Sequence, residues 1–151
     1  MFARRALLPM LAAGLVGACG ATEAPPVAGS CTGDPAAIVT ALAAAPAAVE
    51  LPDGATISAC VKNARTGAEL QNVGVTFSSA AEDLEARAID GDADAAVQLG
   101  YLVGAATSGA KTTSGVAAEL VHRLERSAGF DGTAAVDAAL EQGVAAGERL
   151  G

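Results

Sequence analysis

The chain has 151 residues, 52% of them hydrophobic, which is enough for one domain with a modest core. About a quarter of the residues are alanine, Trp is absent and aromatic residues make up 3%, so the core is expected to pack through close approach of helices. The formal charge is −8, and the sequence shows no basic patch beyond Arg4-Arg5. Nucleic acid and anionic lipid headgroups are therefore not expected to bind the folded domain, because both require clustered Lys and Arg. Sugar binding is also disfavoured, because few aromatic rings are available for stacking.

The N-terminal residues have the pattern of an export signal. Arg4-Arg5 supplies positive charge, and the apolar segment at residues 6–18 has signal-peptide length and is too short to span a bilayer. The last residues, VGAC at 16–19, resemble the lipobox of bacterial lipoproteins, in which small residues precede an obligatory cysteine. This resemblance, which covers residues 1–19 only, implies a diacylglyceryl group on Cys19 and cleavage just before it. The alternative is an ordinary secretory signal in which Cys19 is incidental.

The expected mature chain begins at Cys19 and is anchored to a cell membrane on its extracytoplasmic side. Each buried methylene of an acyl chain contributes roughly 0.8 kcal/mol, so two or three chains hold a protein firmly. Residues 20–30, GATEAPPVAGS, are small, contain two prolines and lack apolar periodicity, which is typical of a tether. The sequence thus predicts a signal peptide at 1–18, a flexible tether at 19–30 and one domain at 31–151. Processing would leave 17 acidic against 7 basic residues, a net charge of −10.

Cys31 and Cys60 remain as an even pair in a chain exported to an oxidising compartment, which predicts a disulfide bond between them. Closing a loop of this length would stabilise the fold by roughly 3 kcal/mol in the chain-entropy model. Two buried free thiols are the alternative. A redox or metal role is disfavoured, because neither cysteine lies in a CxxC motif and the single histidine is far along the chain.

Two short helices are expected at the start of the domain. Asp34 is an N-cap followed by Pro35 at the first helical position, and the run AAIVTALAAA continues to Pro46, which ends or kinks the helix. A shorter apolar element follows at residues 57–61. If the two helices pack as an antiparallel pair, the two cysteines of the predicted disulfide lie near each other.

Apolar residues recur every three or four positions from Thr66 to Ala88, which predicts one long helix with an apolar stripe. The stripe consists of Leu70, Val73, Phe77, Ala81, Leu84 and Ala88. A short strand is the competing interpretation for residues 73–77, because Val73, Val75 and Phe77 alternate with Gly and Thr. The longer pattern favours the helix.

Three further helices are separated by breaks: one at Asp90-Gly91, one near Thr107-Ser108-Gly109 and one at residues 130–132. The first runs through residues 95–106, and Ser114 can cap the next. Expected core positions are Ala117, Leu120, Val121, Leu124 and Ala128, and then Val136, Leu140 and Val144 of a final helix. Together these elements predict an all-α fold: an antiparallel helical bundle of two long hairpins, with an N-terminal helix pair tied by the disulfide.

Internal similarity leaves two interpretations open. Six residues between positions 90 and 105 match six between 131 and 146 at one constant offset, as in a duplication, but any two alanine-rich hairpins with Asp-Gly turns would look similar. Residues 91–102, GDADAAVQLGYL, also resemble one unit of a tetratricopeptide-like solenoid, which implies an adaptor. Such arrays need about three units, so a closed bundle is the simpler expectation.

Three aspartates alternate as the first ligands of an EF-hand calcium loop do: Asp90, Asp92 and Asp94. The rest of the loop is missing, because Ala95 and Tyr101 stand where the turn glycine and the bidentate glutamate belong. Acidic residues at a helix start stabilise its N-terminus, so capping explains the pattern without a metal.

Glu119 and His122 have the ExxH spacing of ferritin-like di-iron helices. A di-iron site needs two such motifs, and His122 is the only histidine, so these residues are expected on a solvated helix face.

No catalytic, cofactor-binding or metal-binding residue is identified, and the chain is not expected to be an enzyme. The leading hypothesis is a lipid-anchored interaction or structural module that binds another envelope protein. The alternatives are a carrier of a small hydrophobic ligand or lipid and a tetratricopeptide-like adaptor.

Overall fold

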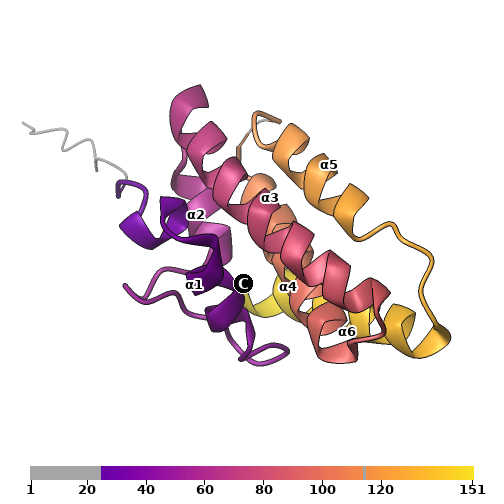
Figure 1. Cartoon of the computed structure of the whole chain (residues 1–151). Helices are drawn as coiled ribbons and strands as arrows, with labels where there is room; N and C mark the ends of the chain where they lie inside the picture. The colour runs from indigo at the N-terminus through magenta and orange to yellow at the C-terminus, as the bar shows by residue number, and fades with distance from the viewer. Residues whose placement is uncertain (1–24, 114) are drawn as a thin grey trace, which may run out of the picture.

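The computed structural model describes residues 25–113 and 115–151, which form six α-helices and one short 3-10 helix (Figure 1). In chain order these are η1 (Gly29–Thr32), α1 (Pro35–Leu42), α2 (Ile57–Asn63), α3 (Gly67–Ile89), α4 (Ala93–Ala110), α5 (Ala118–Ser127) and α6 (Ala134–Leu150). These residues contain no strand, so the predicted all-α fold is confirmed. The predicted signal peptide, the lipidation site Cys19 and the cap Ser114 lie outside the described residues.

Side-chain caps explain where the helices begin. The Asp34 carboxylate accepts a hydrogen bond at 3.0 Å from the backbone N–H two residues on, at the start of α1. Thr66 and Glu69 form a reciprocal capping box at the start of α3, where the Thr66 N–H donates to Glu69 at 2.9 Å. Asp92 and Thr133 cap α4 and α6. These local hydrogen bonds join residues at most four apart in sequence, which is why the sequence pattern located the helices.

The long helix predicted between Thr66 and Ala88 is confirmed as α3. Val73 and Phe77 are fully buried, whereas Val75 is 59% exposed. A strand would place all three on one face. The helical period of the apolar residues therefore prevails over the short alternation at residues 73–77.

α4 is the central helix of the domain. It contacts α1, α2, α3, α5 and α6, and residues on all of its sides are buried. A helix that is apolar on all sides is stable only when it is surrounded by other apolar groups, and the neighbouring helices surround α4 in this way. No helix in the described ranges combines the length and the apolar character needed to cross a membrane.

The closest helix packing joins α4 to α6 and is made by glycines. Gly100 and Gly104 of α4 lie against the stretch of α6 that carries Gly143 and Gly147. A Cβ atom at any of these four positions would overlap a carbonyl oxygen of the facing helix. The two backbones therefore touch directly, at a distance that side chains would prevent.

The glycine contacts also give the direction of the helices. Gly143 lies near Val97 and Tyr101, and Gly147 lies near Tyr101 and Ala105, so α4 and α6 run parallel. α3 and α5 also run parallel. The N-terminal halves of both helices line the same cavity, and their C-terminal parts together line a second cavity. The result is an up-and-down arrangement in which consecutive helices alternate in direction.

The predicted bundle is confirmed, but the partner of its last helix is not the expected one. The sequence pattern paired the last two helices in a hairpin, whereas α6 packs along α4, and α5 contacts mainly α3 and α4. The physical reason is surface shape. The glycine stripe of α6 fits the glycine stripe of α4, while α5 offers Leu120 and Leu124 to its neighbours.

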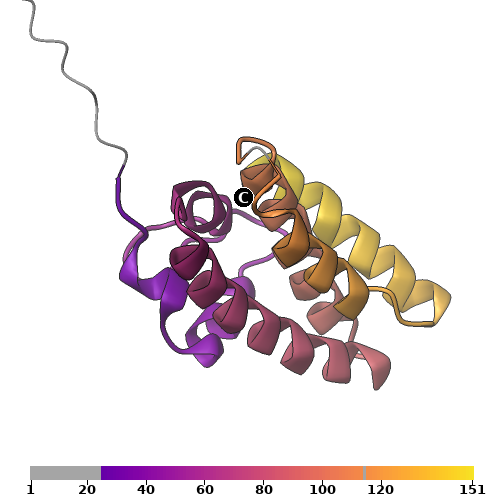
Figure 2. The same cartoon turned by 90° about the horizontal axis from the view of Figure 1, so that it is seen from above.

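The N-terminal elements are tied to the bundle at two points. Cys31 and Cys60 form the predicted disulfide, with a Cα–Cα distance of 5.5 Å and both residues buried. The bond joins α2 to η1, which precedes α1, rather than to α1 itself. The Val49 N–H donates a 3.1 Å hydrogen bond to the buried Tyr101 hydroxyl, which fixes the loop after α1 on the central helix. Figure 2 shows these elements on one side of α3, with α5 and α6 on the other.

Candidate functional site

A groove between α3 and α5, called here the α3–α5 groove, is the candidate functional site. Its first cavity has a volume of about 260 Å³, and its second, nearer the C-terminal ends of both helices, about 400 Å³. Side chains that line the first cavity include Leu70, Gln71, Val116, Glu119, Leu120 and Arg123. The second is lined by Ser78, Glu82, Glu85, Arg123, Arg126 and Ser127. Because Arg123 lines both, the two cavities form one continuous surface.

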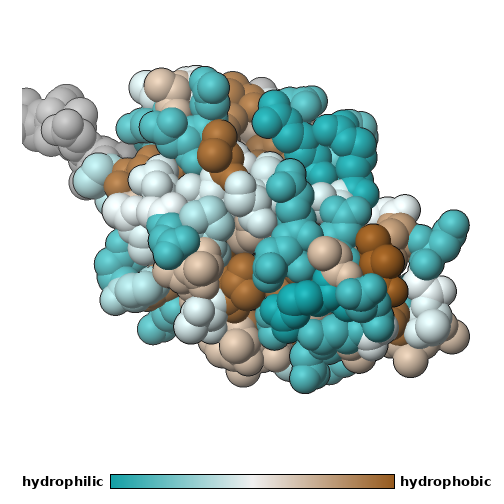
Figure 3. Space-filling view, viewed as in Figure 1, coloured by the Kyte–Doolittle hydropathy of each residue, from teal (hydrophilic) through white to brown (hydrophobic). Residues whose placement is uncertain are grey.

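The groove exists because α5 is held by a narrow apolar face. Ala117, Leu120 and Leu124 are buried, and the charged side chains of α5 are exposed. Leu120 packs beside Gly74 of α3 at an ordinary distance, because a Cβ atom on Gly74 would still lie 3.7 Å from the Leu120 Cδ1 atom. Figure 3 shows a largely hydrophilic surface over α5 and the neighbouring part of α3.

The second cavity contains polar groups that lack partners. Glu82, Glu85 and Arg126 line the same cavity, yet within residues 25–113 and 115–151 they form no ion pair. In the same region, the Ser78 hydroxyl is buried and makes no hydrogen bond. Buried polar groups in proteins are normally paired, so the Ser78 hydroxyl has unused hydrogen-bonding capacity, while Glu82 and Arg126 are exposed and available for charge pairing.

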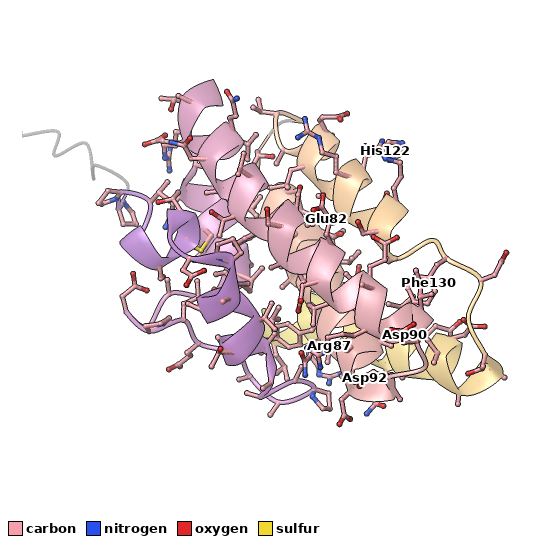
Figure 4. All side chains as sticks on the ribbon, in the orientation of Figure 1. Glu82, Arg87, Asp90, Asp92, His122 and Phe130 are labelled. Atoms are coloured by element: carbon pink, nitrogen blue, oxygen red, sulfur yellow. A yellow bond between two sulfur atoms is a disulfide. The ribbon has the colours of Figure 1, made fainter. Side chains whose placement is uncertain are left out.

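The groove opens toward a strongly acidic end of the bundle, where α3 and α5 finish and α4 and α6 start. Within residues 82–94 and 131–137, Arg87 is the one basic residue. The acidic residues there, called here the acidic end, are Glu82, Asp83, Glu85, Asp90, Asp92, Asp94, Asp131 and Asp137. Ile89 is 58% exposed among them and Phe130 is half-buried. Figure 4 shows Asp90, Asp92 and Phe130 near one another at this end.

Asp92 has a structural role that accounts for part of the calcium-like spacing. Its carboxylate accepts hydrogen bonds from the Ala95 N–H at 3.0 Å and from Arg87 at 2.9 Å. These contacts, the backbone one first, hold the pKa of Asp92 below its usual value. Asp90 is the C-cap of α3, and Asp94 lies in the first turn of α4. Among the residues that the structure describes, no three His, Cys, Asp or Glu side chains are grouped so as to hold a metal ion.

The ExxH residues of α5 do not face a common centre. The Glu119 carboxylate lies 3.2 Å from the Arg123 Nε atom, and the His122 Nδ1 atom lies 3.2 Å from the Glu125 carboxylate. His122 has a side chain 70% exposed, and in Figure 4 it points away from the bundle. Each residue thus pairs along its own helix, as expected of a solvated face.

Sequence reasoning located the disulfide pair but not the groove. The residues of the second cavity lie about forty positions apart on two helices, and only their packing brings them together. The glycine contact did have a visible signal, because Gly100-Gly104 and Gly143-Gly147 each have the G-x-x-x-G spacing of close helix packing.

Comparisons with known proteins add no relative to this description. No protein-family model matches the chain, and no curated protein or solved structure is similar to it at a significant level. The features that bear on function are therefore the groove, the charge distribution and the N-terminal sequence.

Proposed function

We propose that this protein is a lipid-anchored helical protein of the bacterial cell envelope, and that it binds another envelope protein through the α3–α5 groove. The lipobox-like residues 16–19 support the anchor. The observation that carries the binding proposal is the second cavity, where charged groups of both signs and a buried hydroxyl face one space without partners. The proposal includes no catalytic step and no cofactor.

The lining of the groove describes the partner's chemistry. The first cavity offers the apolar side chains of Leu70, Val116 and Leu120, and Val116 is 58% exposed. The second offers two carboxylates and two guanidinium groups. A complementary segment would place an apolar anchor in the first cavity and side chains of both charges in the second, since interfaces combine an apolar core with a polar rim. The acidic end beside the groove would steer a basic partner toward it.

Site-specific photo-crosslinking in cells tests the groove. A photoreactive amino acid at Gln71 samples the first cavity, and one at Glu82 samples the second. Gln142 is the matched control, because it is an exposed residue of α6, on a helix that does not line the groove. We expect one and the same adduct from both groove positions and none from Gln142, with a lower yield when Arg126→Ala is added. Equal capture from Gln142, or different adducts from the two groove positions, would refute the proposed surface.

A separate variant tests the anchor. In Cys19→Ser the thiol that would carry the diacylglyceryl group is gone, so unprocessed precursor without acyl chains is expected in the intact mass. Normal processing together with partition into detergent would contradict the lipoprotein assignment, whatever the crosslinking shows.

A second candidate, a carrier of a small hydrophobic ligand, is favoured by one cavity. It lies between α1 and α3, has a volume of about 320 Å³, and is lined by Pro35, Ala36, Val39 and Ala80 with Thr40, Ser79 and Asp83 at its polar side. This volume lies at the small end of the range for ligand pockets. Native mass spectrometry after gentle extraction should show a bound molecule, with less in Ala36→Leu, which narrows the cavity. A mass equal to that of the protein alone would remove the carrier hypothesis.

The tetratricopeptide-like adaptor remains a prediction from residues 91–102 alone, whereas such an array needs about three units.

A further inference from the structure

Three basic residues lie at the end of the bundle opposite the acidic end: one on α2, one just before α3 and one at the end of α4. Lys62 in the last turn of α2 and Arg65 just before α3 line a cavity of about 280 Å³ together with Val116. Lys111 is the C-cap of α4, beside Thr112 and Thr113 of the same cavity. We call Lys62, Arg65 and Lys111 the basic end.

Most of this charge is available to a partner. Lys62 and Arg65 are exposed and take part in no ion pair among the described residues. Lys111 has a long contact of 3.9 Å with Glu148, and its side chain is 62% exposed. The nearby Glu69 carboxylate accepts hydrogen bonds from the backbone N–H groups of Thr66 and Arg65, which lower its pKa, so it stays negative and offsets part of the Arg65 charge.

The disulfide brings the tether to this same end. Cys60 precedes Lys62 by two positions and is bonded to Cys31 of η1. α2 packs on the C-terminal part of α4, because Gly109 lies against Ser58 and Val61. The described chain begins at Pro25, six residues before Cys31, and Figures 1 and 4 show this beginning on the side of the bundle away from the acidic end.

The length of the tether limits how the domain can sit. Val27 already packs against the core, so eight positions separate Cys19 from the folded domain, and a chain of that length spans at most about 28 Å. α3, with 23 residues, is about 34 Å long at 1.5 Å per residue. A domain attached at its basic end therefore meets the membrane with that end more readily than with the acidic one.

We propose that the basic end rests on the anionic lipid headgroups of the membrane that holds the anchor, so that the acidic end points away from the bilayer. The proposal rests on the lipid anchor of the proposed function. An anionic surface attracts Lys and Arg side chains that lie within about a Debye length of it. It repels the carboxylates of the acidic end whenever that end comes equally close. The sequence suggested the opposite expectation, no binding of anionic headgroups, because the chain is acidic and shows no basic patch after Arg5. Lys111 lies more than forty positions from Lys62 and Arg65, and only the fold places it at the same end.

Tryptophan fluorescence can test this orientation, because the chain contains no Trp. Val116→Trp places a single reporter beside the basic end, and Ile89→Trp is its matched control at the acidic end, since both residues are 58% exposed. The acylated protein is inserted into vesicles of phosphatidylcholine with one third phosphatidylglycerol, containing brominated lipid as a quencher. We expect stronger quenching at position 116 than at position 89, and a loss of this difference at high salt.

Reversing the charge of two basic residues tests whether electrostatic attraction causes this orientation. Each basic residue near an anionic surface contributes roughly a fivefold factor to binding, so Lys62→Glu with Arg65→Glu should reduce the preference for the basic end by roughly tenfold or more. Unchanged far-UV circular dichroism of each variant shows that it is folded. Equal quenching at both positions, or a difference that survives the charge reversal, would overturn the proposal. An intact mass without acyl chains would instead refute the anchor, and with it this orientation.

Discussion

Replacing a glycine of the α4–α6 contact by alanine should destabilise the protein, although alanine is the better helix former. In Gly104→Ala the new Cβ atom overlaps the Val144 carbonyl oxygen and lies 2.9 Å from the Glu148 nitrogen. Both are backbone atoms, so no side-chain rotation relieves the overlap, and the two helices must move apart.

The magnitude follows from two opposing effects. Alanine in a helix interior is favoured over glycine by about 1 kcal/mol. Overpacking of a tight contact costs about 1–3 kcal/mol or more, and it is at the upper end here because backbone meets backbone. Separation by a fraction of an ångström also weakens the dispersion contacts along both helices. We expect a net loss of about 2 kcal/mol in the free energy of unfolding.

Gly74→Ala is the matched control, because it makes the same change inside a helix of the same protein. Its Cβ atom meets only the Leu120 Cδ1 atom at 3.7 Å, an ordinary contact. This variant should therefore gain up to about 1 kcal/mol from helix propensity. The two substitutions should differ by about 3 kcal/mol, or roughly 10 °C in melting temperature for a domain of this size.

Urea and thermal unfolding followed by circular dichroism at a helical wavelength measure both variants in the mature protein with the disulfide oxidised. A second check uses Gly143→Ala, which places a Cβ atom in the same α4–α6 contact from the α6 side. Once one substitution has separated the helices the other should cost less, so the double variant with Gly104→Ala should lose less than the sum of the single losses. If Gly104→Ala is as stabilising as Gly74→Ala, the backbones of α4 and α6 are not in contact and the reasoning fails.

Three further outcomes are expected. Tyr101→Phe should lower the free energy of unfolding by about 1–3 kcal/mol, because the buried Val49 N–H loses its acceptor, and the amide of Val49 should exchange faster with solvent; an unchanged exchange rate would contradict this hydrogen bond. Reductant alone should leave the Cys31–Cys60 bond intact, because both residues are buried. Replacing both cysteines by serine should lower the free energy of unfolding by roughly 3 kcal/mol. Rapid thiol labelling of the native protein in reductant would contradict the burial of this bond. Three carboxylates have pKa values lowered mainly by hydrogen bonds: Asp53 by Ser30, Glu69 by Thr66 and Asp92 by Ala95. Their contribution to the free energy of unfolding is complete above the ordinary pKa values, 3.8 for Asp and 4.5 for Glu. It is lost as the pH falls through the lower pKa values of the folded state. Acid titration of stability should show this decline, and Asp92→Asn should flatten it; an equal slope in that variant would argue against the Asp92 contribution.

The helices could be predicted because their determinants are close in sequence. Asp34 and Thr66 cap helices through backbone groups two and three residues away, and the apolar stripe from Leu70 to Ala88 repeats within a few residues. The disulfide was predictable for a different reason: once Cys19 is assigned to the anchor, two cysteines remain in an exported chain.

The partner of the last helix and the candidate site were not predictable in this way. Whether α6 packs on α5 or on α4 depends on shape complementarity between surfaces about forty residues apart, and the glycine spacing shows that a close contact exists without naming its partner. The same holds for the charged residues of the groove, which belong to different helices. It holds also for Lys62 and Lys111, which lie at one end of the bundle because α2 packs on the C-terminal part of α4.

By itself the sequence determined the main helices, the all-α class and the Cys31–Cys60 pair, since each depends on local hydrogen bonds, apolar periodicity or a simple count of cysteines. It also predicts the export signal and the anchor at Cys19, which lie outside the residues that the structure describes. It did not predict η1, and it extended the first helix to Pro46, whereas α1 ends at Leu42. Tertiary structure alone decided that α4 is central, that α6 lies on it through bare glycine backbone, and that acidic and basic residues separate to opposite ends of the bundle. These features arise from contacts between distant segments, and such contacts form only where packed surfaces fit in three dimensions.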